Sequence, residues 1–464
     1  MKRLVFFATL TLLSIFAGSS RLLAIGWNII DMGSGDGLMY GIAAGNGRND
    51  GVTRIYGANA NARVYEFTYS GGTWNRTDMG KGTYNMMCVT VGDGENNGKM
   101  RVYSGDSNGN VLEFTFSGTS WQSPVTITTL PQQVNSIAIG KGENDSVNRI
   151  YCACSDDHLY ELSYNAGVWN KVDMGSGGNT MSSVTLGNGR NDGITRIYGA
   201  NVDDHIYEFT YTGGTTWSKA DLGSGSANMA SVAVGNGRND GVTRVYGGNG
   251  DGHVYEFSNV SASSWTITDM GSGVTSPTVY TMQSVLIENG QNDGVMRVYA
   301  ADQDSRIYEL TYTGSAWNMY DMSYADSASY MQGIASGNGR NDGVNRIFGA
   351  SRDDHMYEFT HTTSTLITDN FSNNTLGNAI VYPTFANLSR GDKIKFANFT
   401  PSAKIIIISP AGDVIKTLQA DSIGTVPAWD GTVDNGGKAA SGTYIVHASN
   451  TKDEKKIFKI LLIK

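Results

Sequence analysis

The chain has 464 residues with 59 glycines and 7 prolines, and only 17% of its residues are charged. Glycine is about twice as frequent as usual, while 40% hydrophobic and 10% aromatic residues exclude a disordered protein, a collagen or a coiled coil. The net charge of −9 excludes a nucleic-acid partner held mainly through phosphates.

The first 24 residues have the pattern of a secretory signal peptide. Lys2 and Arg3 precede an apolar run over residues 4–16, small residues follow, and Ala24 suits cleavage. The apolar run is shorter than the roughly 20 residues that a membrane-spanning helix needs. We therefore predict export with removal of residues 1–24, and no transmembrane span.

Residues 25–369 contain a sevenfold internal repeat with a period of roughly 48 residues. Each unit contains four short segments with strand character, tight glycine turns between them, and no helical periodicity. Such a unit predicts one blade of a seven-bladed β-propeller, and the chain is therefore expected to be all-β. The repeat is marked by arginine, then Ile or Val, then an aromatic residue, at Arg54, Arg101, Arg149, Arg196, Arg244, Arg297 and Arg346.

Tryptophan positions predict how the ring closes. Six units end in a strand that contains a Trp, but the seventh unit ends at residues 364–369 without one. The missing Trp strand lies at the other end of the repeats, at residues 27–33. We predict that this N-terminal strand completes blade seven, which leaves no open end where blades could add.

A glutamate follows each repeat arginine by 12 residues. If the second and third strands form a hairpin, each arginine lies opposite its glutamate, and the two charges satisfy each other inside the blade. Seven copies argue against catalysis, because an active site is normally singular. The structural ion pairs predicted in this way include Arg54 with Glu66, Arg196 with Glu208, and Arg244 with Glu256.

The glycine turn of each unit contains a recurring aspartate, such as Asp192, and resembles the calcium loops of FG-GAP-type propellers. Those loops carry acids at positions one, three, five and nine. Two of these positions hold Arg190 and Arg196 here, and cations repel calcium. We therefore expect a tight turn, no metal site and no cofactor, with calcium as the alternative.

One rim of the propeller collects polar residues in the loop between the second and third strands. Carboxylates and imidazoles there suit a polyhydroxylated ligand such as a glycan, and turn formation is the alternative role. The predicted ligand-binding residues are Asp157, His158, Asp204, His205, Asp251, His253, Asp354, His355, Arg63 and Arg306. A second repeat position, where the innermost strand begins, predicts an apolar ring at the channel mouth, formed by Met39, Met86, Met181, Met229, Met282 and Met331.

Residues 380–464 differ from the repeats and are basic, and an Asn-rich linker at 370–379 precedes them. They contain Val381-Tyr382-Pro383, Gly412-Asp413-Val414, Trp429-Asp430-Gly431, Gly442-Thr443-Tyr444 and a Lys-rich final strand. This order resembles the FlgD-type immunoglobulin-like domain and the C-terminal sorting domains of bacterial secreted proteins. Thr384-Phe385 departs from the Asn-Pro-Phe common in that family. The resemblance implies a small β-sandwich that serves secretion or surface display, and a single buried Trp429 suits such a core.

These observations favour a secreted or surface-attached monomer that binds glycans or another cell-envelope component without catalysis. Repeated weak sites suit binding to multivalent ligands, and the propeller broadly resembles lectin propellers. One alternative is a polysaccharide lyase or hydrolase with a site at the channel mouth. Another is an adhesion or structural module of the cell surface.

Overall fold

The computed structural model describes residues 26–463 except 262–263, 274–278, 325–329, 362–375, 377–378, 383–384, 391–392, 398, 401 and 422–425. The chain divides into two compact units, Met1–Thr365 and Leu366–Lys464. The predicted signal peptide and most of the predicted linker lie outside the described residues. No helix among the described residues is long and apolar enough to cross a membrane.

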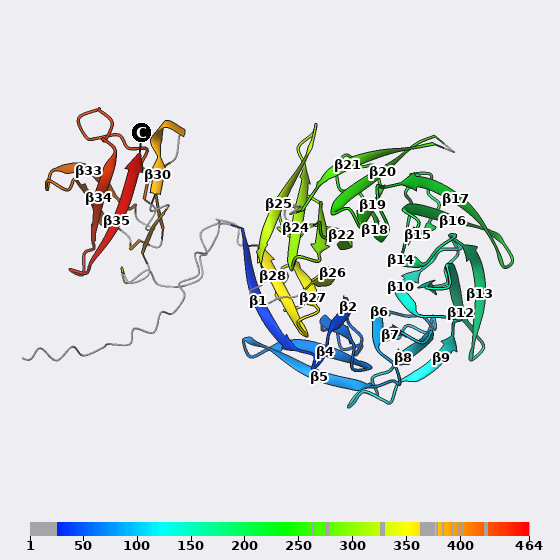
Figure 1. Cartoon of the computed structure of the whole chain (residues 1–464). Coiled ribbons are helices and arrows are strands. Elements are labelled where there is room, and N and C mark those ends of the chain that lie inside the picture. The colour runs from blue at the N-terminus through cyan, green and yellow to red at the C-terminus, as the bar shows by residue number, and fades with distance from the viewer. Residues whose placement is uncertain are drawn as a thin grey trace, which may run out of the picture. The chain divides into compact units, whose positions relative to one another are not determined.

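The first unit is a ring of seven four-stranded antiparallel sheets (Figure 1), which confirms the predicted all-β architecture and its repeated blades. Blades one to three consist of β2 (Met39–Gly45), β3 (Arg54–Asn59), β4 (Arg63–Ser70) and β5 (Thr73–Lys81); β6 (Met86–Gly92), β7 (Arg101–Asp106), β8 (Asn110–Phe114) and β9 (Val125–Thr129); and β10 (Val134–Gly140), β11 (Arg149–Cys154), β12 (His158–Asn165) and β13 (Val168–Ser176). Blades four to six consist of β14 (Met181–Gly187), β15 (Arg196–Asn201), β16 (His205–Gly213) and β17 (Thr216–Ser224); β18 (Met229–Gly235), β19 (Arg244–Asn249), β20 (His253–Ser261) and β21 (Ser264–Ser272); and β22 (Met282–Glu288), β23 (Arg297–Asp302), β24 (Arg306–Tyr312) and β25 (Trp317–Tyr324).

Blade seven draws its strands from both ends of the repeat region. Its sheet order is β1-β28-β27-β26, where β1 is Trp27–Ser34, β26 is Met331–Gly337, β27 is Arg346–Ser351 and β28 is His355–His361. Strand β1 pairs with β28 in antiparallel register, with Trp27 opposite His361. The predicted closure by the N-terminal strand is confirmed.

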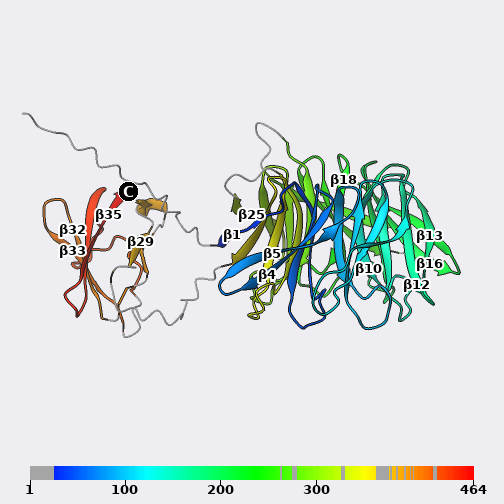
Figure 2. The same ribbon diagram turned by 90° about the horizontal axis from the view of Figure 1, so that it is seen from below.

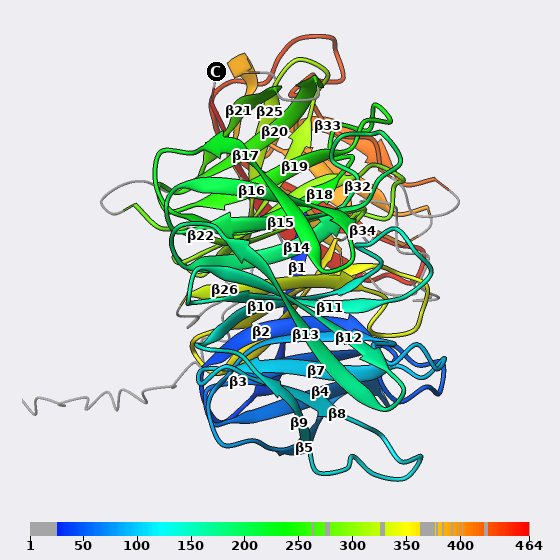
Figure 3. The same ribbon diagram turned by 90° about the vertical axis from the view of Figure 1, so that its right-hand side faces the viewer.

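In each blade one strand of the four lies nearest the ring axis and another lies outermost, as the view along the axis shows (Figure 1); the outermost strand contains a Trp except in blade two, where Trp121 precedes β9. Figure 2 shows the propeller edge-on, and Figure 3 shows outer strands such as β13 and β17 facing the viewer. The hydrophobic core lies between adjacent blades, where, for example, Tyr198 and Ile206 of blade four pack with Val245 and Phe257 of blade five.

The Trp of an outer strand packs against a buried aromatic ring of the preceding blade. Trp121 meets Tyr56 edge-on with ring centroids 6.2 Å apart, and Trp27 meets Tyr299 at 5.8 Å. Edge-to-face pairs of this kind add stability beyond their buried area. The regular Trp spacing in the sequence therefore reflects contacts between blades.

One asparagine in each glycine turn ties its blade to the next. Asn191 has φ of 58°, and its Nδ2 donates to the carbonyl of Thr243 in blade five at 2.9 Å. Its Oδ1 accepts the backbone N–H of Thr243 at 2.7 Å. The same pair of hydrogen bonds joins Asn49 to Met100, Asn96 to Asn148, Asn144 to Thr195, Asn239 to Met296, Asn292 to Asn345, and Asn341 to Thr53. The last of these pairs joins blade seven to blade one. We call the whole set of seven asparagines and their hydrogen bonds the asparagine clasp.

The second unit contains two sheets around its own core. A five-stranded sheet has the order β30 (Phe385–Asn387), β35 (Lys455–Ile463), β34 (Gly442–Ser449), β32 (Lys404–Ile408) and β33 (Val414–Gln419). A two-stranded sheet pairs β29 (Ile380–Tyr382) with β31 (Lys395–Ala397), and a short 3-10 helix, η2, spans Leu388–Arg390. Trp429 is 2% exposed in the core, as predicted, and donates its indole N–H to the carbonyl of Thr432.

Removing one clasp should destabilise the propeller. Asn341→Gly keeps a residue that tolerates positive φ but deletes both hydrogen bonds between blades seven and one. We expect the free energy of unfolding to fall by about 1–3 kcal/mol, measured by urea denaturation. The free energy of unfolding should fall further in Asn341→Ala, because alanine must also adopt the left-handed backbone. An unchanged urea midpoint in Asn341→Gly would show that the clasp contributes nothing.

Candidate functional site

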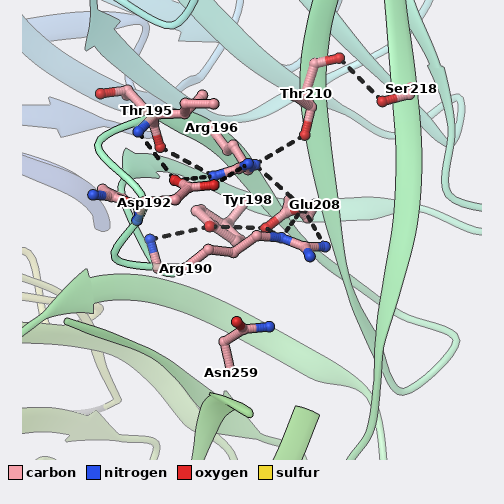
Figure 4. A network of polar contacts seen from close by, with 12 residues as sticks. Arg190, Asp192, Thr195, Arg196, Tyr198, Glu208, Thr210, Ser218 and Asn259 are labelled. Carbon is pink, nitrogen blue, oxygen red and sulfur yellow. Dashed lines mark hydrogen bonds and ion pairs between the residues drawn. The ribbon is translucent and has the colours of Figure 1, made fainter. Parts of the chain in front are cut away.

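The repeat arginine binds first to the aspartate of its own turn. Arg196 donates from both terminal nitrogens to Asp192, at 2.9 and 2.7 Å, and these hydrogen bonds lower the pKa of Asp192 to about 2 (Figure 4). Its Nε donates to Thr210 Oγ1 at 3.1 Å. In every blade except blade two, where Asn97 replaces the aspartate, the turn aspartate binds its repeat arginine in this way. The aspartate carboxylate thereby neutralises the largely buried guanidinium.

The predicted partner glutamate lies in the same network, but in a different register. Glu208 stands opposite Tyr198, while Arg196 Nε lies 3.5 Å from its carboxylate. The same distance is 3.7 Å for Arg54 with Glu66 and for Arg244 with Glu256. The pairs therefore exist as diagonal contacts rather than directly opposed residues, because the hairpin is centred one position away from the expected point.

A second arginine, which lies in the glycine turn of each such blade, is the closest cation to this glutamate. The sequence pattern predicted only a turn role for it. Arg190 donates from Nε to both oxygens of Glu208, at 2.8 and 3.0 Å, and Tyr198 donates its hydroxyl at 3.0 Å (Figure 4). The side chain of Glu208 is only 1% exposed. Two arginines and one tyrosine thus compensate the cost of burying this carboxylate.

The residue at the position of this second arginine differs between blades. Arg48, Arg238 and Arg340 repeat the arrangement in blades one, five and seven, with ion pairs to Glu66, Glu256 and Glu358. In blades two and three this position holds Glu95 and Glu143, so the repeat arginine alone pairs with two carboxylates. In blade six the position holds Gln291. Burial, reinforced by the charge of Glu143, raises the pKa of Glu161 in blade three to about 7.

The second arginine also lies against an aromatic ring of the following blade. The guanidinium of Arg238 lies 4.4 Å from the Tyr312 ring centroid, and Arg340 lies 4.3 Å from Tyr69. Arg48 lies 4.5 Å from Phe116. The junction of blades four and five differs, because Asn259 takes the place of the aromatic residue opposite its Trp (Figure 4).

A cavity of about 510 Å³ lies at the junction of blades five and six. Arg238, Asp269, Tyr312 and Trp317 are among its lining residues. Two aromatic rings, a cation and a carboxylate in one hollow are groups that hold a polar ring-shaped ligand.

The predicted histidines lie on the rim opposite the glycine turns and bind to the outermost strand of their own blade. Asp269, the partner of His253, also lines the cavity between blades five and six. Nδ1 of His205 lies 2.9 Å from Asp221, and its ring stacks on Tyr207 with centroids 5.8 Å apart. Tyr207 donates its hydroxyl to Asp203. His158, His253 and His355 repeat this with Asp173, Asp269 and Asp31, and Arg63 and Arg306 pair with Asp78 and Asp321. The rim residues therefore link the third strand of a blade to its outermost strand through side-chain contacts with carboxylates.

The predicted aspartates of this rim occupy two different positions. Asp157, Asp204 and Asp354 have φ of 72°, 80° and 75°, so they form the turn. Asp251 instead accepts hydrogen bonds from Tyr255 and from the backbone of His253, as Asp203 does in blade four. Asp251 therefore corresponds to Asp203, and Gly252, with φ of 83°, supplies the turn residue in blade five.

The six predicted methionines begin the innermost strands, but their side chains do not form the channel mouth. All six, Met39, Met86, Met181, Met229, Met282 and Met331, are 0% exposed. They pack between blades; Met229 alone among them also contacts the channel cavity. The residue after each methionine faces the axis instead, because successive side chains on a strand alternate in direction.

The channel cavity has a volume of about 700 Å³ and receives residues from the innermost strand of every blade. Its lining combines amides, hydroxyls and one tyrosine with apolar residues that include Ile42, Val89, Ile137 and Ile334. The residues that follow the methionine positions are Tyr40, Met87, Asn135, Ser182, Ala230, Gln283 and Gln332.

Blade six holds two buried carboxylates that the sequence analysis did not single out. Asp302 takes the position of Asn59, Asn201 and Asn249, and burial raises its pKa to about 7. Burial likewise raises the pKa of neighbouring Asp304. Neither residue lines the channel cavity or the cavity at the junction of blades five and six. The only signal in the sequence is the change from Asn to Asp at one repeat position.

The fold and these repeated polar junctions define a lectin-type propeller. The model of the fungal fucose-specific lectin family matches residues 89–336, which is more than half of the chain. The chain belongs to this family. No curated protein matches the sequence.

Solved structures support the propeller fold. PorZ, described as an essential bacterial surface component of the type-IX secretion system of Porphyromonas gingivalis, is 16% identical with a TM-score of 0.51. The match covers 94% of this chain and 60% of that chain, so the protein spans about three fifths of the PorZ chain. The WD40 repeats of RRP9 (9% identity, TM-score 0.53, 72% and 97% covered) and the WD40 propeller of Doa1 (12%, 0.53, 74% and 99%) are also similar. At these identities the likeness shows the fold alone.

Truncating a repeat arginine should destabilise the propeller. Arg196→Ala leaves Asp192 and Glu208 with one cation fewer, and Glu208 is almost fully buried. We expect a loss of about 3 kcal/mol in the free energy of unfolding, seen as a lower melting temperature. Asp192→Asn should cost less, because Asp192 is 39% exposed. A melting temperature of Arg196→Ala equal to that of the wild type would contradict the structural role.

The link between His355 and Asp31 should depend on pH. Partial burial by itself lowers the pKa of His355, but the hydrogen bond and charge of Asp31 raise it more, so the net pKa is raised. A raised pKa in the folded state means that the link stabilises fully below about pH 6.5 and is lost as the pH rises through the folded-state pKa.

His355→Gln should therefore lower the free energy of unfolding at pH 5.5 but not at pH 9. The side chain is 33% exposed, so solvent screening keeps the difference near about 0.5 kcal/mol. Urea denaturation at both pH values measures it, with His447→Gln in the second unit as the control. An equal effect at both pH values would rule out a protonation-dependent link.

Proposed function

We propose that the protein is a secreted or surface-attached lectin that binds fucose-containing glycans at the junctions between propeller blades, without catalysis. The cavity between blades five and six carries this proposal, because it combines Arg238, Tyr312 and Trp317 in one hollow. Membership of the fungal fucose-specific lectin family supports the choice of sugar.

The chemistry of the cavity suits a sugar ring. The apolar face of a pyranose packs on aromatic side chains, while its hydroxyl groups need donors and acceptors at fixed positions. Tyr312 and Trp317 supply rings, and Asp269, which also lies 2.9 Å from His253 Nδ1, supplies an acceptor. Arg238 presents a planar cation whose orientation is set by Glu256.

The junctions are repeated but not identical. An arginine over an aromatic ring of the next blade occurs where blade seven meets one, one meets two, four meets five and five meets six, and at the junction of four and five the ring is that of Trp265, 5.7 Å from Arg190. Several weak sites on one ring would let a multivalent glycan surface bind more tightly than any single site does. The rim set that includes His205 and His355 stays a prediction as a second group of ligand contacts.

The second unit is proposed to be an FlgD-type immunoglobulin-like domain, at residues 380–464, that sorts or attaches the protein at the cell surface. Its two sheets around a core with buried Trp429 support this, as does the order of its motifs. Together with the predicted signal peptide at 1–24, this would locate a propeller at 25–369 outside the cell. The structurally similar PorZ is itself a bacterial surface component.

Filling the cavity should abolish one site without disturbing the core. Ser315 is exposed at the cavity edge, so Ser315→Trp should lower the number of L-fucose molecules bound per chain by one in calorimetric titration. Thr215→Trp, at the matching hairpin of blade four, is the control, because junction three to four holds Glu143 in place of the second arginine.

A glycan array with the full chain tests the ligand class, and mass spectrometry of the bound glycans tests for turnover. We expect fucosylated glycans to bind and to remain intact. Cleaved products would favour the polysaccharide lyase or hydrolase. Loss of binding in His205→Ala with unchanged binding in Ser315→Trp would move the site to the opposite rim.

A further inference from the structure

One charged residue breaks the sevenfold pattern at the mouth of the channel. The residue that follows the second strand of each blade is uncharged in six blades, and Arg352 takes this place in blade seven. Val202 and Gly250, at the same repeat position in blades four and five, line the channel cavity. The repeat therefore places Arg352 at the rim of this cavity. The other four residues at this position are Ala60, Ser107, Ser155 and Gln303.

Two tyrosines orient the guanidinium of Arg352. Its central carbon lies 5.6 Å from the Tyr40 ring centroid and 5.5 Å from that of Tyr330. Tyr40 lines the cavity, and Tyr330 takes the repeat position at which Gln133 and Thr180 line it in blades three and four. Tyr330 also has φ of 54°, a strained backbone for a residue other than glycine, of the kind found at binding sites.

The guanidinium donates to no acceptor within the part of the chain that the structure describes. The two nearest acids in the sequence are committed elsewhere: Asp353 accepts the hydroxyl of Tyr357 and the backbone N–H of His355, and Asp354 lies 3.3 Å from His355 Nε2. A planar cation held by cation–π contacts, with its N–H groups unused, is prepared for a bidentate anion.

The rest of the mouth is polar but uncharged. None of the described residues that line the cavity is charged, and amides and hydroxyls such as Gln133, Asn135, Ser182, Gln283 and Gln332 face it. Gln332 donates to Gln283 at 3.0 Å, which fixes two of these amides. A volume of about 700 Å³ lies within the usual range for sites that hold small molecules.

We propose that this channel mouth binds a small polyhydroxylated ligand with one carboxylate, such as an acidic sugar. Arg352 receives the carboxylate, Tyr40 and Tyr330 flank it, and the amides receive the hydroxyl groups. The site is separate from the blade junctions and does not rest on the proposed binding of fucose.

Calorimetric titration of the full chain with D-glucuronate and with D-glucose tests the proposal, because the two sugars differ at the carboxylate. We expect glucuronate to bind and glucose to bind at least about tenfold more weakly. Arg352→Gln should weaken glucuronate binding by about tenfold or more, and Arg352→Lys should retain part of it because the charge remains. Added salt should weaken binding.

Arg76→Gln is the matched control, since Arg76 also stacks on a tyrosine, Tyr65, but pairs with Asp36 at 2.8 Å. It should leave glucuronate binding unchanged. Equal binding of both sugars, no binding of either, or full binding in a folded Arg352→Gln would each overturn the proposal. Ser315→Trp should not affect glucuronate and Arg352→Gln should not affect fucose, so the two proposals can fail independently.

Discussion

The structure depends on the two hydrogen bonds that each turn asparagine makes to the backbone of the next blade. Asn191 bonds Thr243 in this way, and Asn341 bonds Thr53, which joins the last blade to the first. Pairing of β1 with β28 completes the seventh sheet at the same seam. A closed ring has no free end, so the positions of every junction and of the central channel follow from this linkage.

Burial of charge within the ring explains why the blades are not equivalent. Six blades bury a glutamate such as Glu208, blade two half-buries Glu113, and in four blades two arginines neutralise this charge. Blades two, three and six lack the second arginine, so their glutamates keep fewer positive partners. The same second arginine stacks on the aromatic ring of the following blade, so the residue that stabilises a blade also shapes the junction next to it. Stability and the proposed sugar sites are therefore linked through one side chain.

Repeated residues in this propeller mostly hold it together, whereas one departure from the repeat marks the proposed binding site at the channel mouth. The rim histidines recur and pair with aspartates of the outer strands, as His205 does with Asp221. Arg352 occurs once, at a mouth whose described lining is uncharged, and its guanidinium has aromatic neighbours but no described acceptor.

The sequence by itself determined the number of blades and the closing strand, because a sevenfold repeat leaves one assignment for each element. It also predicted the buried Trp429, because this is the one tryptophan of the second unit. It also indicated the Arg–Glu network, since charges at a fixed spacing inside a buried sheet must meet. Register and side-chain direction were decided only by the tertiary structure. Glu208 faces Tyr198, and the channel is lined by the residue after each methionine. The asparagine clasp and the contacts of Arg352 also became visible only in the tertiary structure. Contacts between blades join residues about one repeat apart or, at the seam, residues from opposite ends of the repeat region.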